Sequence, residues 1–422
     1  MDYLLISGGQ KLRGKITING AKNAALPMIA ASILTEDVVE LNNVPNVSDI
    51  STMSLLIESL GGQISRDIAN KKINISCQRI NNYTANYEIV SKMRASIWVL
   101  APLLARFGKA KVALPGGCAI GVRKVDLHIA VLEAMGANIT LDHGYIDASI
   151  TGKLKATEFN FDLVSVGATI TAIMAATLAE GISSFYNCAQ EPEIINMCHM
   201  LNAMGADIRN IGSNHIVVRG VKELSGINYS IMFDRIEAGT YMLAAAITKG
   251  RIELNGIDDF DSIENILFKL SQAGVKNYVQ GTSIIIDAEG SEILPLNIHT
   301  QVYPGFPTDL QAQFIPFLCL ASGTSVVTEN IFDNRFMHVP ELCRMGADIT
   351  IQNNSAIIKP IKSFYGAAVI SSDLRCSASL VIAALIAQGE SKIQRIYHLD
   401  RGYENFDVNL SKCGAKISRH QE

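Results

Sequence analysis

A cysteine follows a Pro-Gly-Gly turn at Cys118, and the next charged residues along the chain are Arg123 and Lys124. Turns of this composition usually lie in exposed loops. Nearby positive charge lowers the pKa of a thiol and so favours the nucleophilic thiolate. Cysteine is more often a small buried hydrophobe, but the flanking glycines argue against burial at Cys118. We therefore expect a chemical role for Cys118 and core packing for the other cysteines.

Six short polar clusters precede segments of small apolar residues, which we expect to be buried helices. Ser, Thr and Asp at the start of a helix accept hydrogen bonds from its unpaired backbone N–H groups. We expect this capping role for Ser165, Thr169 and Asp234. The clusters are Lys22-Asn23, Arg94-Ala-Ser96, Ser165 to Thr169, Asp234-Arg235, Thr308-Asp309 and Asp373-Leu-Arg375.

Cations at the start of a helix are unfavourable because they face the positive end of the helix dipole. Lys22, Arg94 and Arg375 stand at such positions, so we expect an anionic ligand there, which the backbone N–H groups also attract. Asp309 follows a Pro-Gly-Phe-Pro turn and is either a helix cap or a positioned base. The Cys and His residues lack zinc spacing, and the glycines form neither a dinucleotide nor a P-loop motif. We therefore expect no metal and no cofactor.

One pattern recurs six times: an apolar residue, three others, a glycine, two others and then usually isoleucine. The repeat length is about 70 residues, and each glycine would end an amphipathic helix in the left-handed conformation before a strand begins. A second landmark, the alanine-rich helix, repeats in phase. Each unit is thus predicted to hold two helices and three or four strands. The repeat glycines are Gly61, Gly136, Gly205, Gly274, Gly346 and Gly414.

Units of this length exceed a typical solenoid repeat, so 422 residues fit two globular domains of three units each. We place the boundary near residue 230. The first domain would span 21–231, and the second would combine 1–20 with 232–422. Residues 1–20 resemble a strand pair that completes the last unit and closes the chain on itself.

The composition narrows the functional class. Hydrophobic residues make up 48% and charged residues 18% of the chain, which excludes a disordered tail protein. The formal charge of −4 argues against nucleic acid or an anionic membrane as a partner. The N-terminus lacks the basic region of a secretory signal, and the apolar stretch 97–105 is too short to cross a membrane. Scattered cysteines fit a reduced cytoplasm.

Several motifs carry a resemblance to a known family. The chain resembles the enolpyruvyl transferases, and within them the members that act on UDP-N-acetylglucosamine, over about residues 12–419. The motifs occur in one order along the chain: Gly20-Ala-Lys22-Asn23-Ala-Ala-Leu-Pro27, Leu114-Pro-Gly-Gly-Cys118, Ser165-Val-Gly-Ala-Thr169, Tyr303-Pro-Gly-Phe-Pro-Thr-Asp309, Asn334-Arg335-Phe-Met-His338, Asp373-Leu-Arg375 and Asp400-Arg401-Gly-Tyr-Glu404.

This resemblance implies an α/β fold, a two-domain inside-out α/β barrel of six βαβαββ units with a discontinuous second domain. It also implies transfer of the enolpyruvyl group of phosphoenolpyruvate to the 3-hydroxyl of UDP-N-acetylglucosamine. Phosphate is released through a tetrahedral ketal, without metal or organic cofactor. The reaction would open peptidoglycan synthesis, and fosfomycin, a thiol-directed mimic of phosphoenolpyruvate, would alkylate Cys118.

The resemblance also assigns site residues. Cys118 would be the general acid and form an adduct with phosphoenolpyruvate, Asp309 would be the base for the sugar hydroxyl, and Asp373 would assist proton transfer. The phosphoenolpyruvate contacts would be Lys22, Asn23, Arg123, Arg375 and Arg401, with Arg335 nearby; Lys22 and Arg401 would also be catalytic. The nucleotide-sugar contacts would be Asn23, Arg94, Arg123, Lys124, Val125, Asp126, Leu127, Leu163, Val164, Ser165, Val166, Asp309 and Ile331.

Two positions depart from the family pattern. Lys124 stands where many members have proline, which would loosen the loop, and Leu163 stands where some carry a lysine near the diphosphate. Two rival interpretations remain open. One is the related transferase that acts on shikimate 3-phosphate, and the other is a six-unit ring that encloses DNA, which the acidic net charge disfavours.

Overall fold

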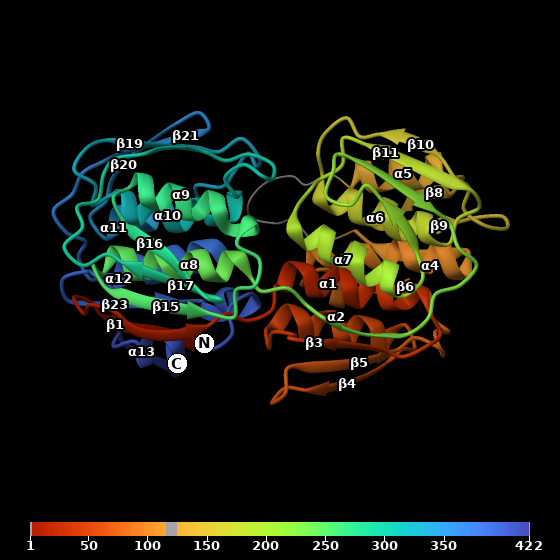
Figure 1. The fold of residues 1–422 in the computed structure, drawn as a ribbon, viewed down its shortest axis with the longest axis horizontal. Coiled ribbons are helices and arrows are strands. Elements are labelled where there is room, and N and C mark those ends of the chain that lie inside the picture. Colours follow the sequence, from red (N-terminus) through yellow and green to blue (C-terminus); the bar gives the residue numbers. More distant parts are fainter. Residues whose placement is uncertain (1, 115–124, 422) are drawn as a thin grey trace. The chain divides into compact units, whose positions relative to one another are not determined.

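The computed structural model describes residues 2–114 and 125–421, and these form two compact units. Unit 1 holds residues 2–19 and 233–421, and unit 2 holds 20–114 and 125–232. Each unit has its own hydrophobic core. The described residues form six four-stranded sheets, three in each unit (Figure 1). The predicted α/β class and the six-fold repeat are confirmed.

Unit 2 contains three sheets with helices between the strands. The first sheet runs β14 (Ile227–Ser230), β3 (Val39–Asn42), β5 (Lys72–Ser76), β4 (Gln63–Asp67). The second runs β6 (Thr84–Ala85), β7 (Lys109–Ala113), β9 (Tyr145–Ser149), β8 (Asn138–Asp142), and the third β10 (Glu158–Asn160), β11 (Ile182–Tyr186), β13 (His215–Arg219), β12 (Asp207–Arg209). The helices are α1 (Lys22–Ala31), η1 (Ser32–Leu34), α2 (Ser48–Ser59), α3 (Tyr87–Val90), η2 (Arg94–Val99), α4 (Leu100–Phe107), α5 (Asp126–Ala134), α6 (Val166–Thr177) and α7 (Pro192–Ala203).

Unit 1 repeats this organisation. Its sheets run β16 (Lys276–Gln280), β17 (Ser283–Asp287), β15 (Arg251–Asn255), β2 (Arg13–Thr17); then β18 (Asn297–His299), β19 (Ser325–Thr328), β21 (Ser355–Lys359), β20 (Asp348–Gln352); then β22 (Ala368–Ile370), β23 (Glu390–Gln394), β1 (Asp2–Ser7), β24 (Lys416–Gln421). Its helices are α8 (Arg235–Ile247), η3 (Asp261–Ile263), α9 (Glu264–Gln272), η4 (Thr308–Leu310), α10 (Gln311–Leu318), α11 (Val339–Arg344), α12 (Leu374–Ala384), η5 (Ile396–Arg401) and α13 (Phe406–Lys412).

The N-terminal strands complete two different sheets. β1 inserts into the last sheet and pairs with β23 and β24, as expected (Figure 1). β2 instead joins the sheet of the fourth repeat, parallel to β15. The prediction that both strands complete the last repeat is therefore wrong for β2.

The position of β2 reflects an exchange of strands. Each repeat has a leading strand that pairs in parallel with the strand after the first helix, as β10 does with β11. β2 leads the first repeat in sequence but pairs in the fourth, and β14 leads the fourth but pairs in the first. The chain passes from one unit to the other directly after each of these strands. Asn19, at the first passage, donates its backbone N–H and side-chain amide to the Glu237 carboxylate at 2.8 and 2.9 Å.

The six repeat glycines all follow a helix and have φ between 84° and 108°. The residue after each glycine donates its N–H to the apolar residue that opens the motif, as Ala206 does to Leu201 at 3.0 Å. This bond defines the Schellman motif, in which glycine avoids the clash of a Cβ with the backbone. The predicted left-handed helix ends are confirmed at every repeat.

The small-residue helices are buried along most of their length, as their composition predicted. Every residue of α8 and α10 is buried, and these two helices pack against each other and against α12. Six of the seven described cysteines are also buried. Cys343 is exposed, so its predicted core role is wrong. Within the described residues, each helix is too short or too polar to cross a membrane.

Gly205→Ala should lower the free energy of unfolding by about 1 kcal/mol, because an L-residue is strained in the left-handed region. A Cβ at this position would meet no described atom within 4 Å, so the effect comes from the backbone alone. Gly205→Asn should lose less, since Asn tolerates this conformation. Urea denaturation of the three proteins measures the differences. Equal stability of wild type and the Ala variant would contradict the assignment.

Candidate active site

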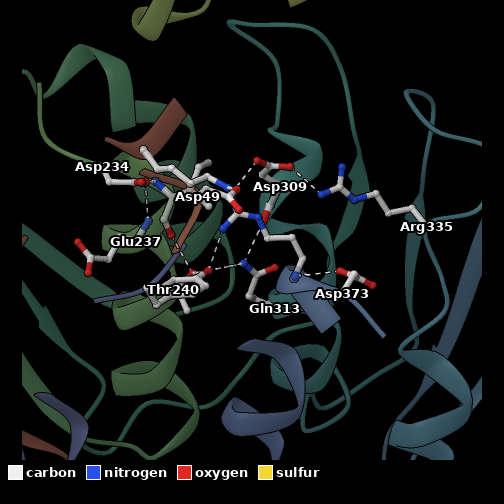
Figure 2. Close-up of polar contacts among 12 residues, drawn as sticks. Asp49, Asp234, Glu237, Thr240, Asp309, Gln313, Arg335 and Asp373 are labelled. Carbon is white, nitrogen blue, oxygen red and sulfur yellow. Dashed lines mark hydrogen bonds and ion pairs between the residues drawn. The ribbon is translucent and has the colours of Figure 1, made fainter. Parts of the chain in front are cut away.

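A carboxylate held by two arginines lies at the start of α10. Asp309 accepts from Arg335 at 2.6 Å on one oxygen and from Arg375 at 2.7 Å on the other. Figure 2 shows the side chain of Arg335 pointing at Asp309. Both arginine side chains are less than one-tenth exposed, while that of Asp309 is 26% exposed. Of the two interpretations of Asp309 that the sequence left open, its contacts favour positioning over capping.

The electrostatics of this trio follow from burial and pairing. Burial raises the pKa of Asp309, but Arg375 and Arg335 outweigh it and hold that pKa well below the usual value. Arg335 has two further nitrogens, Nε and Nη1, that are buried and lack a hydrogen-bond partner among the described residues. Buried donors without partners are costly, so this guanidinium is suited to an additional anionic ligand.

The buried helices of unit 1 begin beside this trio. Asp234 caps α8 through bonds from the N–H groups of Ile236 and Glu237, both at 2.9 Å. Asp373 caps α12 through bonds from Arg375 and Cys376 at 2.9 and 3.0 Å. The predicted cap at Asp234 is confirmed. Asp373 is also a helix cap, while its part in proton transfer stays a prediction.

A buried histidine lies close to the same charges. Burial lowers the pKa of His338 to about 4, although Asp373 acts in the opposite direction. Its Nε2 is buried and has no hydrogen-bond partner in the part of the chain that the structure describes. His338 is therefore neutral at physiological pH, and it adds no positive charge to the site.

Glu329 fixes the backbone around Asp309 on two sides. Its carboxylate accepts from the hydroxyls of Thr300 and Thr308, both at 2.8 Å, and from the N–H of Ile331 at 2.8 Å. Thr308 directly precedes Asp309, and Ile331 is a predicted sugar contact. One buried carboxylate thus positions both segments.

In unit 2, Lys22 is the first residue of α1, and its ammonium lies 3.0 Å from the Asp49 carboxylate. Both residues are buried. The structure therefore gives this cation an acidic partner that the sequence argument did not foresee. Asn23 follows it on the first turn of the helix.

Several of the predicted nucleotide-sugar residues of unit 2 lie at or near the start of α6. Ser165 caps this helix by accepting from Ala168 at 3.3 Å. Trp98, on the helix that Arg94 opens, donates to the carbonyl of Gly167 at 3.2 Å. Thr169 accepts a bond from the backbone N–H of Ala189 at 3.1 Å, one turn inside the helix, so its predicted capping role is wrong.

His128 holds α5 against α6 beside these residues. Its Nδ1 lies 2.7 Å from the hydroxyl of Thr171. Burial, together with the charge of Arg94, lowers the pKa of His128 to about 4. Arg94 and the starts of α5 and α6 are thus close in space, although Arg94 and α5 belong to the second repeat and α6 to the third.

The remaining predicted residues lie on α5, beside Ser165, at the end of η5 or outside the described residues. Val125, Asp126 and Leu127 form the start of α5, whereas Val164 and Val166 flank Ser165. Leu163 is 72% exposed, and Arg401 ends η5. Cys118, Arg123 and Lys124 lie outside the described residues. In the described ranges, no group of three His, Cys, Asp or Glu side chains is arranged to hold a metal ion.

The structure adds residues that the sequence reasoning missed, namely Asp49, Glu329, Gln313 and Tyr403. Gln313 donates to the backbone carbonyl of Asp309 at 2.9 Å, and Tyr403 is linked to the Asp309 carboxylate through Arg375. Tyr403 stood inside a motif quoted for the family resemblance, and Gln313 one turn after Asp309. Asp49 and Glu329 had no such signal, since each is distant in sequence from the residue it holds.

Comparison with known proteins places the chain among enolpyruvyl transferases. The family model described as EPSP synthase (3-phosphoshikimate 1-carboxyvinyltransferase) matches residues 6–410. The chain is 54% identical to the UDP-N-acetylglucosamine 1-carboxyvinyltransferase of Rickettsia bellii over 99% of this chain and 100% of the relative. It is 53% identical to the enzyme of that name from Rickettsia canadensis, with the same coverage.

Solved structures support the fold. The enolpyruvyl transferase NikO from Streptomyces tendae matches with a TM-score of 0.90 at 21% identity, covering 100% of this chain and 99% of that one. EPSP synthase from Acinetobacter baumannii matches with a TM-score of 0.74 at 21% identity over both full chains. At this identity the two likenesses bear on the fold alone.

Asp309→Asn should lower the free energy of unfolding by about 3 kcal/mol at neutral pH, because it leaves two buried arginines without their negative partner. The pKa of Asp309 is lower in the folded than in the unfolded chain, where it is about 3.9. The stabilisation is therefore complete above that value and is lost as the pH falls through the folded pKa.

Chemical denaturation between pH 7 and pH 3 measures this effect. The gap between wild type and Asp309→Asn should be constant down to about pH 5 and narrow in acid. Asp258→Asn, which alters an exposed carboxylate of unit 1, is the control and should show no gap. A gap that stays unchanged in acid would refute the ion-pair account.

Proposed function

Because the chain belongs to the EPSP synthase family of enolpyruvyl transferases, we propose that it transfers the enolpyruvyl group of phosphoenolpyruvate to the 3-hydroxyl of UDP-N-acetylglucosamine and releases phosphate. The observation that carries the choice of acceptor is the 54% identity, over essentially the whole chain, to enzymes named for UDP-N-acetylglucosamine. The interpretation as a DNA-enclosing ring has no support in this family.

The first half of the reaction depends on the Asp309 trio. The O3 atom of the sugar bonds to C2 of phosphoenolpyruvate, its proton passes to Asp309, and another proton is added at the methylene carbon. A carboxylate with a strongly lowered pKa is a poor base, so the two arginines must be drawn away from it. An anionic substrate does this, because it offers Arg335 and Arg375 a competing partner. Binding of the anion would therefore raise the basicity of Asp309.

The second half removes phosphate from the tetrahedral ketal. The C2–O bond to phosphate breaks while a proton leaves the new methyl group, which restores the enol ether. We assign the methylene proton to Cys118 and a share of the proton handling to Asp373. Lys22, Arg123, Arg375 and Arg401 balance the charge of phosphoenolpyruvate and phosphate, and Asn23 adds a polar contact.

We assign the nucleotide sugar to residues of unit 2, together with Asp309 and Ile331 of unit 1. The start of α6 offers backbone N–H groups to a diphosphate. Arg94 adds a positive charge at this place. The exposed Leu163 supplies no charge, in keeping with its departure from the family pattern. The assigned residues are Asn23, Arg94, Arg123, Lys124, Val125, Asp126, Leu127, Leu163, Val164, Ser165, Val166, Asp309 and Ile331.

The proposed product is a precursor of peptidoglycan, so the enzyme would serve cell-wall growth. We place it in the cytoplasm, where thiols such as the buried cysteines of both units stay reduced. Its partners would be the two small substrates, without nucleic acid or membrane. No metal or organic cofactor enters the proposed reaction, since acid–base groups and cations suffice for it.

Phosphate release with either acceptor tests the function. With phosphoenolpyruvate present, UDP-N-acetylglucosamine should give steady phosphate release, and shikimate 3-phosphate should give less than one-hundredth of that rate, because a missing set of polar contacts costs about that factor or more. Omission of phosphoenolpyruvate is the control. Faster release with shikimate 3-phosphate would favour the related transferase instead.

Fosfomycin tests the role of the loop thiol. It should add one molecule per chain, and peptide mapping by mass spectrometry should locate the adduct at Cys118, because a thiolate next to cations reacts first. Cys118→Ser should stay unmodified under the same conditions. Modification of Cys343, the exposed cysteine among those described, would count against the assignment.

A further inference from the structure

A fully buried tyrosine contacts Arg375 on the side away from Asp309. Tyr403 is 2% exposed, and its hydroxyl lies 3.1 Å from Nη1 of Arg375. The same hydroxyl lies 2.9 Å from Oγ1 of Thr240 on α8 and 3.2 Å from Nε2 of Gln313 on α10. In Figure 2, Thr240 and Gln313 lie close together, below Asp309 in the view. The three buried helices of unit 1 therefore meet at one phenol oxygen.

The chemistry of the donors limits the directions of the bonds in this cluster. Guanidinium and amide N–H groups only donate, so Arg375 donates to the Tyr403 oxygen, and Gln313 donates one hydrogen to the carbonyl of Asp309 and shares the other between Tyr403 and Thr240. Thr240 donates its one hydroxyl hydrogen to the carbonyl of Ile236 at 2.8 Å, so the Tyr403 hydroxyl donates to Thr240. Burial raises the pKa of Tyr403, although Arg375 opposes this, so the hydroxyl keeps its proton at neutral pH.

This arrangement leaves Arg375 with two anchors of different kinds. One nitrogen is bound to the Asp309 carboxylate, and the other is bound to Tyr403. The Asp309 contact must loosen for Asp309 to act as a base, whereas the Tyr403 contact involves no reacting group. Arg375 lies over the Tyr403 ring as well, 5.8 Å from its centroid. Tyr403 therefore still binds the guanidinium of Arg375 when the contact between Arg375 and Asp309 is broken.

We propose that Tyr403 is a positioning residue, which holds Arg375 in place for the anion of phosphoenolpyruvate while Asp309 is released to act as the base. This role rests on the proposed function. Nothing in the position of Tyr403 requires it to touch substrate, and it acts through Arg375.

The chain supplies a matched control. Tyr241 is also fully buried and also packs against Phe406, at 5.1 Å between ring centroids compared with 4.9 Å for Tyr403. Its hydroxyl accepts from Asn409 at 3.2 Å. Replacing either tyrosine by phenylalanine removes one buried hydroxyl from the same aromatic cluster, but only Tyr403 is bonded to Arg375.

The test compares Tyr403→Phe with Tyr241→Phe in the full-length enzyme by phosphate release. Tyr403→Phe should lower kcat/KM for phosphoenolpyruvate about tenfold, the effect of losing one hydrogen bond to a charged group. The KM for UDP-N-acetylglucosamine should change less than twofold. Tyr241→Phe should leave both parameters within twofold. Thr240→Val, which removes the acceptor of the Tyr403 hydroxyl, should act in the same direction as Tyr403→Phe but more weakly.

A double-mutant cycle separates positioning from general packing. In an Arg375→Lys background, Tyr403→Phe should have an effect of less than twofold, because the partner of the hydroxyl is already altered. Full additivity, equal effects on both substrates, or equal behaviour of the two tyrosine variants would overturn the role of Tyr403. A wild-type enzyme that releases no phosphate would instead overturn the proposed function, and this role with it.

Discussion

Small side chains along the buried helices constrain where polar groups can lie in this protein. Helices α8, α10 and α12 pack against one another with nearly every residue buried, so charged side chains are excluded from their lengths. Charges are accommodated at the helix starts, where backbone N–H groups need partners. Asp234, Asp309 and Arg375 accordingly occupy the starts of the three helices. The close packing of the core thus confines these charged groups to the starts of the helices.

The charges at these ends are balanced within the protein. Lys22 is paired with Asp49, while Arg335 and Arg375 share Asp309. The negative partners stabilise a set of buried cations that would otherwise be costly. In the proposed reaction, the anionic substrate would compete with Asp309 for Arg335 and Arg375, and this competition would link its arrival to the basicity of Asp309.

The first and fourth repeats exchange their leading strands. β2 and β14 each lead one repeat in sequence and complete another in space. The segment that follows β2 is fixed by hydrogen bonds from Asn19 to the carboxylate of Glu237. Each unit therefore contains one sheet whose strands are far apart in the sequence, β3 with β14 in unit 2 and β2 with β15 in unit 1. In unit 1, β1 also pairs with β24, the last strand of the chain.

Much of the fold could be predicted from the sequence. Local rules account for the six glycine-terminated helices, the buried alanine-rich helices and the caps at Ser165 and Asp234, because each depends on neighbours within one turn. The family motifs also pointed to Asp309, Arg335 and Arg375. Local rules failed for β2, whose partner β15 lies more than 200 residues away, and for Thr169, whose hydroxyl serves a distant backbone N–H.

The partners of the charged groups required the folded chain. Asp49 beside Lys22, Glu329 beside Thr308 and Tyr403 beside Arg375 are contacts between separate segments, and the residue types are compatible with many other partners. Burial makes these contacts strong, because unpaired donors are costly in the interior. Burial also raises the pKa of Asp309, but the two arginines outweigh this effect and hold that pKa well below its usual value. The sequence motifs could propose an acid, a base and a set of cations, but the pairing of the described charged groups depends on distances and burial that arise only when the helices pack.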